Sequence, residues 1–141
     1  MFQVLIILLT LVAVIPYSFT YASDSSNQLG TIEFPTSSFG PAQKHFIRGV
    51  AALHSFWYTE ALNAFEKSTI ADPEFAMGYW GLAMTHNHPL WEDQDKKSAR
   101  EALLKITEDS KLTQREQDYI NAVRLLYGDE KKHIRDKTYS K

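Results

Sequence analysis

Two closely spaced histidines are the candidates for metal chemistry in this sequence. His86 and His88 lie one residue apart and are followed by an acidic stretch at residues 92–95. Imidazole and carboxylate side chains together form the ligand set of zinc and of non-haem iron. A catalytic metal site also needs a third fixed ligand, and His54 is the natural candidate. The sequence therefore leaves open a metal-binding protein or metal-dependent enzyme that uses His54, His86 and His88.

Other chemically active groups are not arranged for a reaction. Ser55 follows His54, but neighbouring side chains on a helix point in different directions. The six glycines are scattered along the chain, so no phosphate-binding loop is expected. The sequence contains no cysteine, which excludes thiolate ligands, cysteine nucleophiles and structural disulfides. We therefore expect no catalytic residues and no enzyme activity.

A tetrapeptide that occurs twice indicates how the chain is organised. Residues 54–57 (HSFW) return at 88–91 as HPLW, and Phe46 meets Trp80 at the same offset. This offset matches the period of about 34 residues that is typical of repeats of two antiparallel helices. Such a repeat cannot bury its apolar face alone and must stack on its neighbours. We expect loss of Trp57 or Trp91 mainly to destabilise the fold, by about 3–5 kcal/mol if the rings are fully buried.

The repeat offers an explanation of the histidines that involves no metal. Adjacent helical repeats stack at roughly 10 Å, which is too far for His54 and His88 to share an ion unless their side chains converge. A histidine that precedes the turn at the end of a helix can instead bond to an unpaired backbone carbonyl. It can also pack on Trp57 or Trp91. On this interpretation we expect no metal and no other cofactor.

Apolar periodicity and helix punctuation predict five helices and a weaker tail. The expected helices lie over residues 41–55, from Thr59 to Asp72, over residues 74–87, after the acidic stretch 92–95, and from Thr113 to Gly128. The hydroxyl of Thr59 is expected to cap the second helix. Thr113 and Glu116 have the spacing of a capping box at the start of the fifth. Residues 129–141 contain few apolar side chains and predict a poorly packed end.

Length and charge limit the class of protein. The chain has 141 residues, 44% of them hydrophobic, which is enough for one modest domain. Lys and Arg number 15 against 17 Asp and Glu, and the formal net charge is -2. Such a balance does not favour a polyanionic partner. We expect no nucleic-acid partner.

The N-terminus differs from the rest of the chain. Residues 4–15 are apolar except for Thr10, a run shorter than the about 20 residues that cross a bilayer. With the small residues Thr20 and Ala22 it is typical of a secretory signal peptide over residues 1–22, followed by a linker over 23–40. We expect a secreted, periplasmic or other extracytoplasmic protein. The alternatives are membrane attachment through residues 4–19 by an uncleaved signal, and a buried helix.

The repeat unit resembles the tetratricopeptide repeat. The resemblance rests on Gly49, Ala61, Phe65 and Pro73 in the first unit and on Tyr79, Leu82 and Ala83 in the second. In that family, small residues let two helices approach closely, and the aromatic residue fills the gap to the next repeat. Arg48 and Ser68 depart from the family pattern, which usually has Leu and Ala at these positions.

A closer resemblance covers residues 42–128. The segments LHSFWYTEALNAF (53–65), AMGYWGLAMTHNHPLW (76–91) and TQREQDYINA (113–122) are similar to long secreted bacterial tetratricopeptide-repeat proteins without an established activity. The resemblance implies an all-α fold in which antiparallel helix pairs stack as a short solenoid of about five to six helices. It also implies that the repeat domain over residues 41–141 is incomplete at its C-terminus.

The concave face of such a solenoid is where a peptide ligand is expected. By repeat register, the predicted peptide-binding groove contains Phe46, Val50, Leu53, His54, Met77, Trp80, Met84, Asn87 and His88. This surface is mostly apolar and aromatic, so an apolar or amphipathic helix fits it better than an acidic C-terminal tail. Alternatively, the next superhelical turn or the segment 23–40 covers the same stripe. The resulting hypothesis is a non-catalytic protein–protein interaction scaffold that acts outside the cytoplasm.

Overall fold

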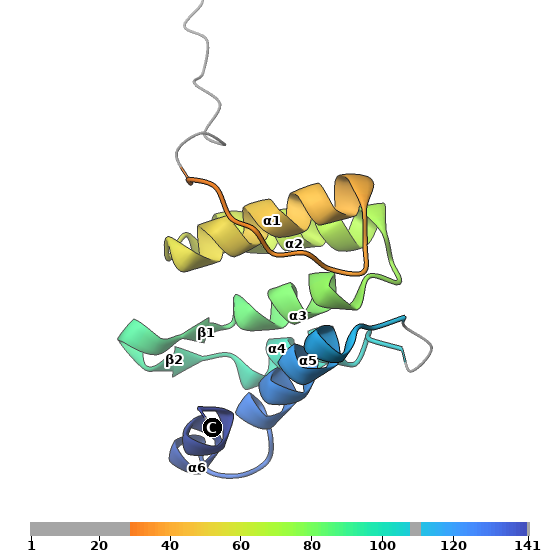
Figure 1. Ribbon diagram of the computed structural model, residues 1–141. Helices are drawn as coiled ribbons and strands as arrows, with labels where there is room; N and C mark the ends of the chain where they lie inside the picture. The colour runs from red at the N-terminus through yellow and green to blue at the C-terminus, as the bar shows by residue number, and fades with distance from the viewer. Residues whose placement is uncertain (1–28, 108–110, 141) are drawn as a thin grey trace, which may run out of the picture.

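The structure is a computed structural model that describes residues 29–107 and 111–140 (Figure 1). The predictions for residues 1–22 and for the first part of the linker lie outside the described residues. The described chain is mostly helical, which confirms the all-α class at that level. Its elements are, in order, α1 (Gly40–His54), α2 (Tyr58–Ala71), α3 (Ala76–Met84), β1 (Asn87–His88), the 3-10 helix η2 (Pro89–Trp91), β2 (Asp93–Gln94), α4 (Lys96–Leu103), α5 (Gln114–Leu126) and α6 (Lys132–Tyr139). Each helix in this part of the chain is too short or too polar to cross a bilayer.

α1 and α2 form an antiparallel pair on which α3 packs (Figure 1). Phe65 of α2 lies at the centre of this packing and is fully buried. A Cβ atom at Gly49 of α1 would come within 2.6 Å of the Phe65 ring, and one at Gly81 of α3 within 2.2 Å. Real Cβ atoms do not approach a ring so closely, so glycine is required at both positions. The two glycines therefore let α1 and α3 close around one aromatic side chain of α2.

The predicted helix starts are partly confirmed. At the start of α5, the Thr113 hydroxyl accepts a bond from the Glu116 N–H at 3.2 Å, and the Glu116 carboxylate accepts one from the Thr113 N–H at 2.8 Å. The capping box is therefore present. The prediction that Thr59 caps α2 is wrong, because α2 begins one residue earlier and its N-cap is Trp57, which makes no side-chain cap bond. Backbone bonds close this turn instead, including one from the Trp57 N–H to the Ala52 carbonyl at 2.9 Å.

The third helix ends earlier than its sequence suggests. α3 stops at Met84, and residues 86–95 include a short antiparallel hairpin, although helix was predicted up to residue 87. Within this hairpin Asn87 pairs with Gln94. The side-chain amide of Gln94 also donates to the side-chain oxygen of Asn87 at 3.1 Å. The hairpin projects from the helical body where α3 passes into α4 (Figure 1).

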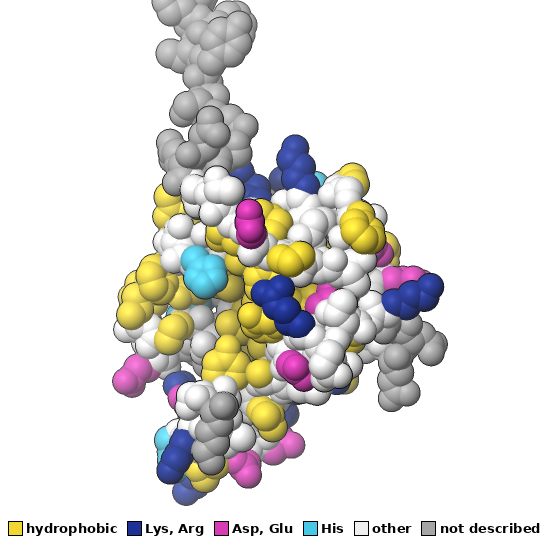
Figure 2. All heavy atoms as spheres, in the orientation of Figure 1, with side chains coloured by type: hydrophobic (Ala, Val, Ile, Leu, Met, Phe, Trp, Pro, Cys, Tyr) yellow, Lys and Arg dark blue, Asp and Glu magenta, His cyan; other side chains and the backbone are white. Residues whose placement is uncertain are grey.

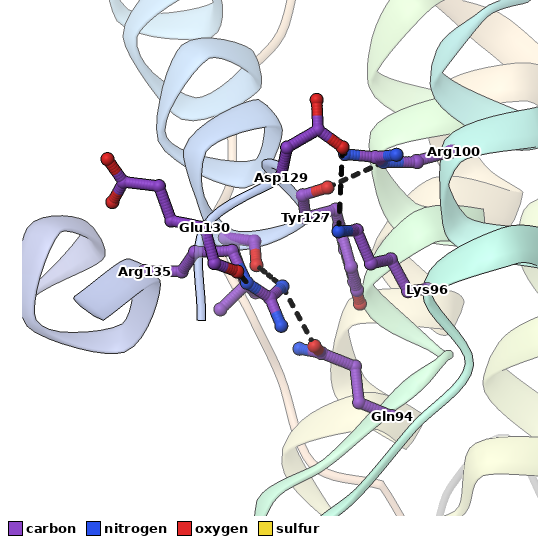
Figure 3. A network of polar contacts seen from close by, with 8 residues as sticks. Gln94, Lys96, Arg100, Tyr127, Asp129, Glu130 and Arg135 are labelled. Atoms are coloured by element: carbon purple, nitrogen blue, oxygen red, sulfur yellow. Dashed lines mark hydrogen bonds and ion pairs between the residues drawn. The ribbon is translucent and has the colours of Figure 1, made fainter. Parts of the chain in front are cut away.

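Polar contacts attach the C-terminal helix (Figure 3). The guanidinium of Arg135 in α6 is buried and donates to the backbone carbonyls of Leu126 and Glu130. Arg100 of α4 donates to the backbone carbonyl of Tyr127 at 2.6 Å. Two arginines thus satisfy carbonyls that the end of α5 leaves without intrahelical partners. This polar attachment is not visible in the apolar periodicity, which indicates only a poorly packed end.

Residues 29–39, here called the strap, carry no helix or strand and run across the helices before they enter α1 (Figure 1). Leu29, Ile32 and Phe34 of the strap pack against the main hydrophobic core. The helices α1, α3 and α5 contribute to the same core. The strap therefore covers the inner side of these helices, where the sequence predicts a ligand groove.

Candidate interaction surface

The residues of the predicted groove differ in their exposure. The buried members are Phe46, Val50, Met77 and Trp80. The half-buried members are Leu53, Met84, Asn87 and His88, while His54 is exposed. The first four are core residues beneath the strap and do not line an open groove. The accessible part of the predicted groove is its other end, around His54 and His88.

The strap covers the buried end with one aromatic side chain. The ring of Phe34 lies 5.2 Å from that of Phe46, 6.1 Å from that of Trp80 and 5.3 Å from that of Tyr119, measured between centroids. Spacings of this size are favourable for aromatic pairs. The guanidinium of Arg115 lies 4.5 Å above the same Phe34 ring on its outer side. Phe34 of the strap thus covers Phe46 and Trp80 of the apolar stripe, in the way that one of the two alternatives for the segment 23–40 predicts.

Polar groups fix the strap backbone in place. Gln43 donates to the Phe34 carbonyl at 2.8 Å. The N–H of Ser37 donates to Glu116 at 2.7 Å, and the Ser37 hydroxyl donates to the same oxygen at 2.9 Å. Because Glu116 also belongs to the capping box of α5, one buried carboxylate connects the strap to that helix.

The Glu116 carboxylate keeps its charge although it is buried. Burial favours its neutral form, but four hydrogen bonds from Ser37 and Thr113 together outweigh that effect. The pKa of Glu116 is therefore lower than its ordinary value. A carboxylate that accepts four bonds can stay ionised without a cation beside it.

The alternative metal site finds no ligand set. Among the residues that the structure describes, no three His, Cys, Asp or Glu side chains could together hold a metal ion. Nε2 of His88 lies 3.0 Å from the carbonyl oxygen of Thr85, and its Nδ1 lies 3.1 Å from the carboxylate of Asp93. His86 is half-buried, and desolvation lowers its pKa. The set of His54, His86 and His88 is therefore not assembled, and the carbonyl contact expected of a histidine near a helix end is found at His88.

Residues from both copies of the tetrapeptide reach the surface, and Tyr58 connects the two copies. We call this cluster the aromatic patch, and its members are Phe56, Trp57, Tyr58, His88, Leu90 and Trp91. Trp57 is 44% exposed and Trp91 63% exposed, while Phe56 and Leu90 are 50% and 66% exposed. Neither tryptophan is fully buried, so the destabilisation expected for buried rings does not apply to them. In Figure 2, hydrophobic side chains reach the surface at the edge where Figure 1 places the hairpin and the end of α1.

Tyr58 connects the two halves of the aromatic patch. Its ring lies 4.1 Å from the His88 ring and 6.1 Å from the Trp91 ring, between centroids. It also lies 6.4 Å from the Phe56 ring in the preceding turn. His88 and Trp91 themselves are 6.5 Å apart with nearly perpendicular rings. The first turn of α2 and the hairpin therefore hold their aromatic side chains in one connected arrangement.

Both turns that carry the aromatic patch have left-handed backbone conformations. The φ angle of Phe56 is 59°, and that of Glu92, directly after Trp91, is 52°. A residue with a Cβ atom is disfavoured in this region, and a bulky aromatic residue is a genuine outlier there. Strained residues of this kind gather at ligand-binding and switch sites. The strain therefore supports a role for these turns beyond folding.

Acidic residues surround the aromatic patch. Residues 54–60 and 86–95 contain four carboxylates, Glu60, Glu92, Asp93 and Asp95, and no Lys or Arg. Glu60 pairs with Arg48 at 2.7 Å, and Asp95 caps α4 by accepting from the Ser98 N–H at 3.0 Å. Glu92 is exposed, and the side chain of Asp93 is 70% exposed although it contacts His88. The surface of the hairpin is thus aromatic and negatively charged.

Comparisons with models of known protein families, with curated proteins and with solved structures gave no match to this chain. The tetratricopeptide resemblance therefore stays a prediction. The features of the aromatic patch are those of the chain itself.

The site differs in part from the one predicted. Of the aromatic patch, the predicted groove contained only His88. Trp57 and Trp91 were expected to stabilise the fold as buried rings, and Phe56, Tyr58 and Leu90 were not predicted as site residues. Part of the signal was present, because Phe56 and Leu90 belong to the tetrapeptide that occurs at 54–57 and again at 88–91. The repeat identifies residues in equivalent places without showing whether another segment covers them.

Proposed function

We propose that this chain is a non-catalytic scaffold for protein–protein interaction and that it binds its partner through the aromatic patch. The observation that carries the proposal is the exposure of Phe56, Trp57, Leu90 and Trp91 on two strained turns whose aromatic rings are connected through Tyr58. Contiguous apolar surface of this kind marks interaction sites in soluble proteins. Trp and Tyr are also the residues that most often contribute large binding energies at interfaces.

The proposal includes a tetratricopeptide-like arrangement of the helix pairs. Its support is the close packing of Phe65 against Gly49, two of the positions on which the resemblance rests. The buried stripe of α1 and α3 also follows the predicted repeat register. The proposed binding surface lies at one end of the inner face, because the strap occupies the other.

The proposed place of action is outside the cytoplasm. Its support is the apolar run at residues 4–15 with the small residues Thr20 and Ala22 after it, the pattern of a secretory signal. Membrane attachment through residues 4–19 is the competing possibility. Sequencing the N-terminus of the protein from cells that express the full chain distinguishes the two, because a cleaved signal leaves Ser23 as the first residue.

Peptide selection tests the proposed binding surface. Random dodecapeptides on phage are selected against the full chain, and the recovered peptides are measured against Trp57→Ala/Trp91→Ala. We expect affinity to fall about tenfold or more, because buried Trp side chains dominate interface energies. Ile70→Ala is the matched control, since Ile70 is exposed on α2 outside the patch and its loss should leave affinity unchanged.

The proposed surface is wrong if selected peptides bind the double tryptophan variant as tightly as the original chain. It is also wrong if no peptide is enriched over a control selection on the double variant. Circular dichroism of each variant shows that a lost affinity does not come from lost helix.

A further inference from the structure

The apolar surface of the aromatic patch does not by itself determine which partner binds. Burial of Trp57 and Trp91 would favour any apolar segment to a similar degree, because the hydrophobic effect is non-directional. The charges at the rim of the aromatic patch discriminate among such segments.

Two carboxylates at the rim are available to a partner. Glu60 is bound to Arg48, and Asp95 is engaged with the backbone and hydroxyl of Ser98. Glu92 and Asp93 are exposed at the tip of the hairpin, directly after Trp91, and one oxygen of Asp93 lies 3.1 Å from Nδ1 of His88. No Lys or Arg occurs within residues 86–95. Arg135 of α6 contacts the hairpin through the side-chain oxygen of Gln94 at 3.0 Å, and among the described residues it forms no ion pair with Glu92 or Asp93.

The aromatic faces favour the same sign of charge as the carboxylates. The face of a Trp or Tyr ring attracts an ammonium or guanidinium group within about 6 Å of its centroid. Trp91 is 63% exposed, so part of its indole is open to such a cation. Glu92 and Asp93 directly follow Trp91 in the sequence, so the aromatic ring and the carboxylates of this turn favour a partner group of the same charge.

We propose that the aromatic patch binds a segment of a partner protein in which Lys or Arg alternates with apolar residues. The inference rests on the proposed function and names the chemistry of its partner. Apolar side chains of the segment pack on Trp57 and Leu90, while its cations lie between the aromatic faces and the carboxylates of Glu92 and Asp93. Charge complementarity of this kind sets partner choice and speeds association. An acidic peptide and an anionic membrane surface are both repelled by the same carboxylates.

Three synthetic peptides test the inference directly. Each is an amphipathic helical peptide with leucine on one face and a single type of polar residue on the other. The polar residue is lysine in the first peptide, glutamine in the second and glutamate in the third. Binding to the full chain is measured by titration calorimetry at low and at physiological salt. We expect the lysine peptide to bind about tenfold more tightly than the glutamine peptide, and the glutamate peptide most weakly. The advantage of lysine should shrink as salt is added.

Charge variants locate the preference. In Glu92→Gln/Asp93→Asn the lysine peptide should lose its advantage over the glutamine peptide. The matched control is Glu66→Gln/Glu74→Gln, which removes two exposed carboxylates from α2 and the turn that follows it. A lysine preference that persists in the first variant, or that disappears equally in the control, overturns the inference.

The outcomes separate this inference from the proposed function. Equal binding of all three peptides that is lost in Trp57→Ala/Trp91→Ala overturns the charge preference and leaves the interaction surface in place. If none of the peptides binds the unmodified chain, the cationic partner is wrong, and the phage selection decides the proposed function independently. Self-association in sedimentation velocity that Glu92→Gln/Asp93→Asn abolishes would instead assign a second copy to the patch. Its α6 contains Lys132 and Lys137 beside the half-exposed Ile134.

Discussion

Two pairs of aromatic positions at the same repeat offset have opposite environments in this molecule. Phe46 and Trp80 are buried, while Trp57 and Trp91 are about half exposed or more. Both pairs have the same separation along the sequence, and both contain large apolar side chains. The first pair is covered by Phe34 of the strap, which lies within 6.1 Å of Trp80 and 5.2 Å of Phe46. Among the described residues, nothing comparable covers the second pair.

This difference shows that a repeated aromatic position does not by itself determine burial. A segment outside the repeats decides which part of an apolar stripe becomes core. The uncovered part lies on turns with left-handed residues at Phe56 and Glu92, a conformation that costs of order 1–3 kcal/mol per residue. At the covered end the left-handed residues are glycines, Gly30 in the strap and Gly40 directly after it, for which this conformation carries no steric cost. The two ends therefore differ in cover and also in the backbone that presents them.

Removing a covered aromatic ring is expected to have the largest effect. In Phe46→Ala we expect a loss of about 3–5 kcal/mol in the free energy of unfolding, because the ring is fully buried beneath Phe34. Urea unfolding followed by circular dichroism measures the loss. A loss below about 1 kcal/mol would mean that the covered end can collapse or rearrange, and the contrast with the exposed end would be weakened.

Removing the charge that holds the strap is expected to have the next largest effect. Both Glu116 oxygens accept two bonds each, and the amide nitrogen of Gln cannot accept any, so Glu116→Gln leaves donors of Ser37 or Thr113 unpaired. We expect a loss of about 1–3 kcal/mol at neutral pH, measured by urea unfolding.

The same substitution makes a prediction about pH. The pKa of Glu116 is lowered in the folded chain, so its contribution is present above the unfolded value of about 4.3 and is lost as pH falls through the lower folded pKa. The stability difference between the unmodified chain and Glu116→Gln should therefore shrink below about pH 4. A difference that stays constant down to acid pH would show that the carboxylate does not stabilise the strap in its ionised form.

The part of the fold that could be predicted from sequence is the part with local signals. Helical periodicity and the capping pair of Thr113 and Glu116 act within a few residues, and the corresponding helices are found. The hairpin was missed because strands of two residues carry no periodic pattern, and its turn depends on the left-handed conformation of Glu92. The strap was predicted only as one of two possible covers of the apolar stripe, because its contact with Glu116 spans 79 residues of sequence and leaves no local signal.

The exposure of the candidate site could not be predicted for a similar reason. The tetrapeptide repeat identified Trp57 and Trp91, but exposure depends on which distant segment lies over a residue. Phe34 reaches Trp80 through the course of the strap, and no local pattern in residues 29–39 specifies that destination. Burial of an aromatic residue is a property of the assembled chain.

Truncating an exposed ring at a repeated aromatic position should lower the free energy of unfolding much less than truncating a covered ring. In Trp91→Ala we expect a loss of about 1 kcal/mol, since most of the indole already faces solvent. Trp80→Ala is the matched comparison, because that ring is buried and should cost about 3–5 kcal/mol. Both losses come from the same urea titration. Equal losses at the two positions would remove the distinction between covered and exposed ends.

The strain at the exposed end predicts the smallest effect. At Phe56 the left-handed backbone costs a residue with a Cβ atom about 1–2 kcal/mol, whereas glycine there loses about 0.5–1 kcal/mol in chain entropy. Phe56→Gly should therefore be more stable than Phe56→Ala by about 0.5 kcal/mol or slightly more, and the comparison cancels the loss of the ring itself. The reference pair is Asn63→Gly and Asn63→Ala at an exposed position inside α2, where glycine should be the less stable by about 1 kcal/mol. If the alanine variant is the more stable one at both positions, the turn at Phe56 is not strained. The aromatic patch would then lack the backbone strain that distinguishes it from an ordinary exposed surface.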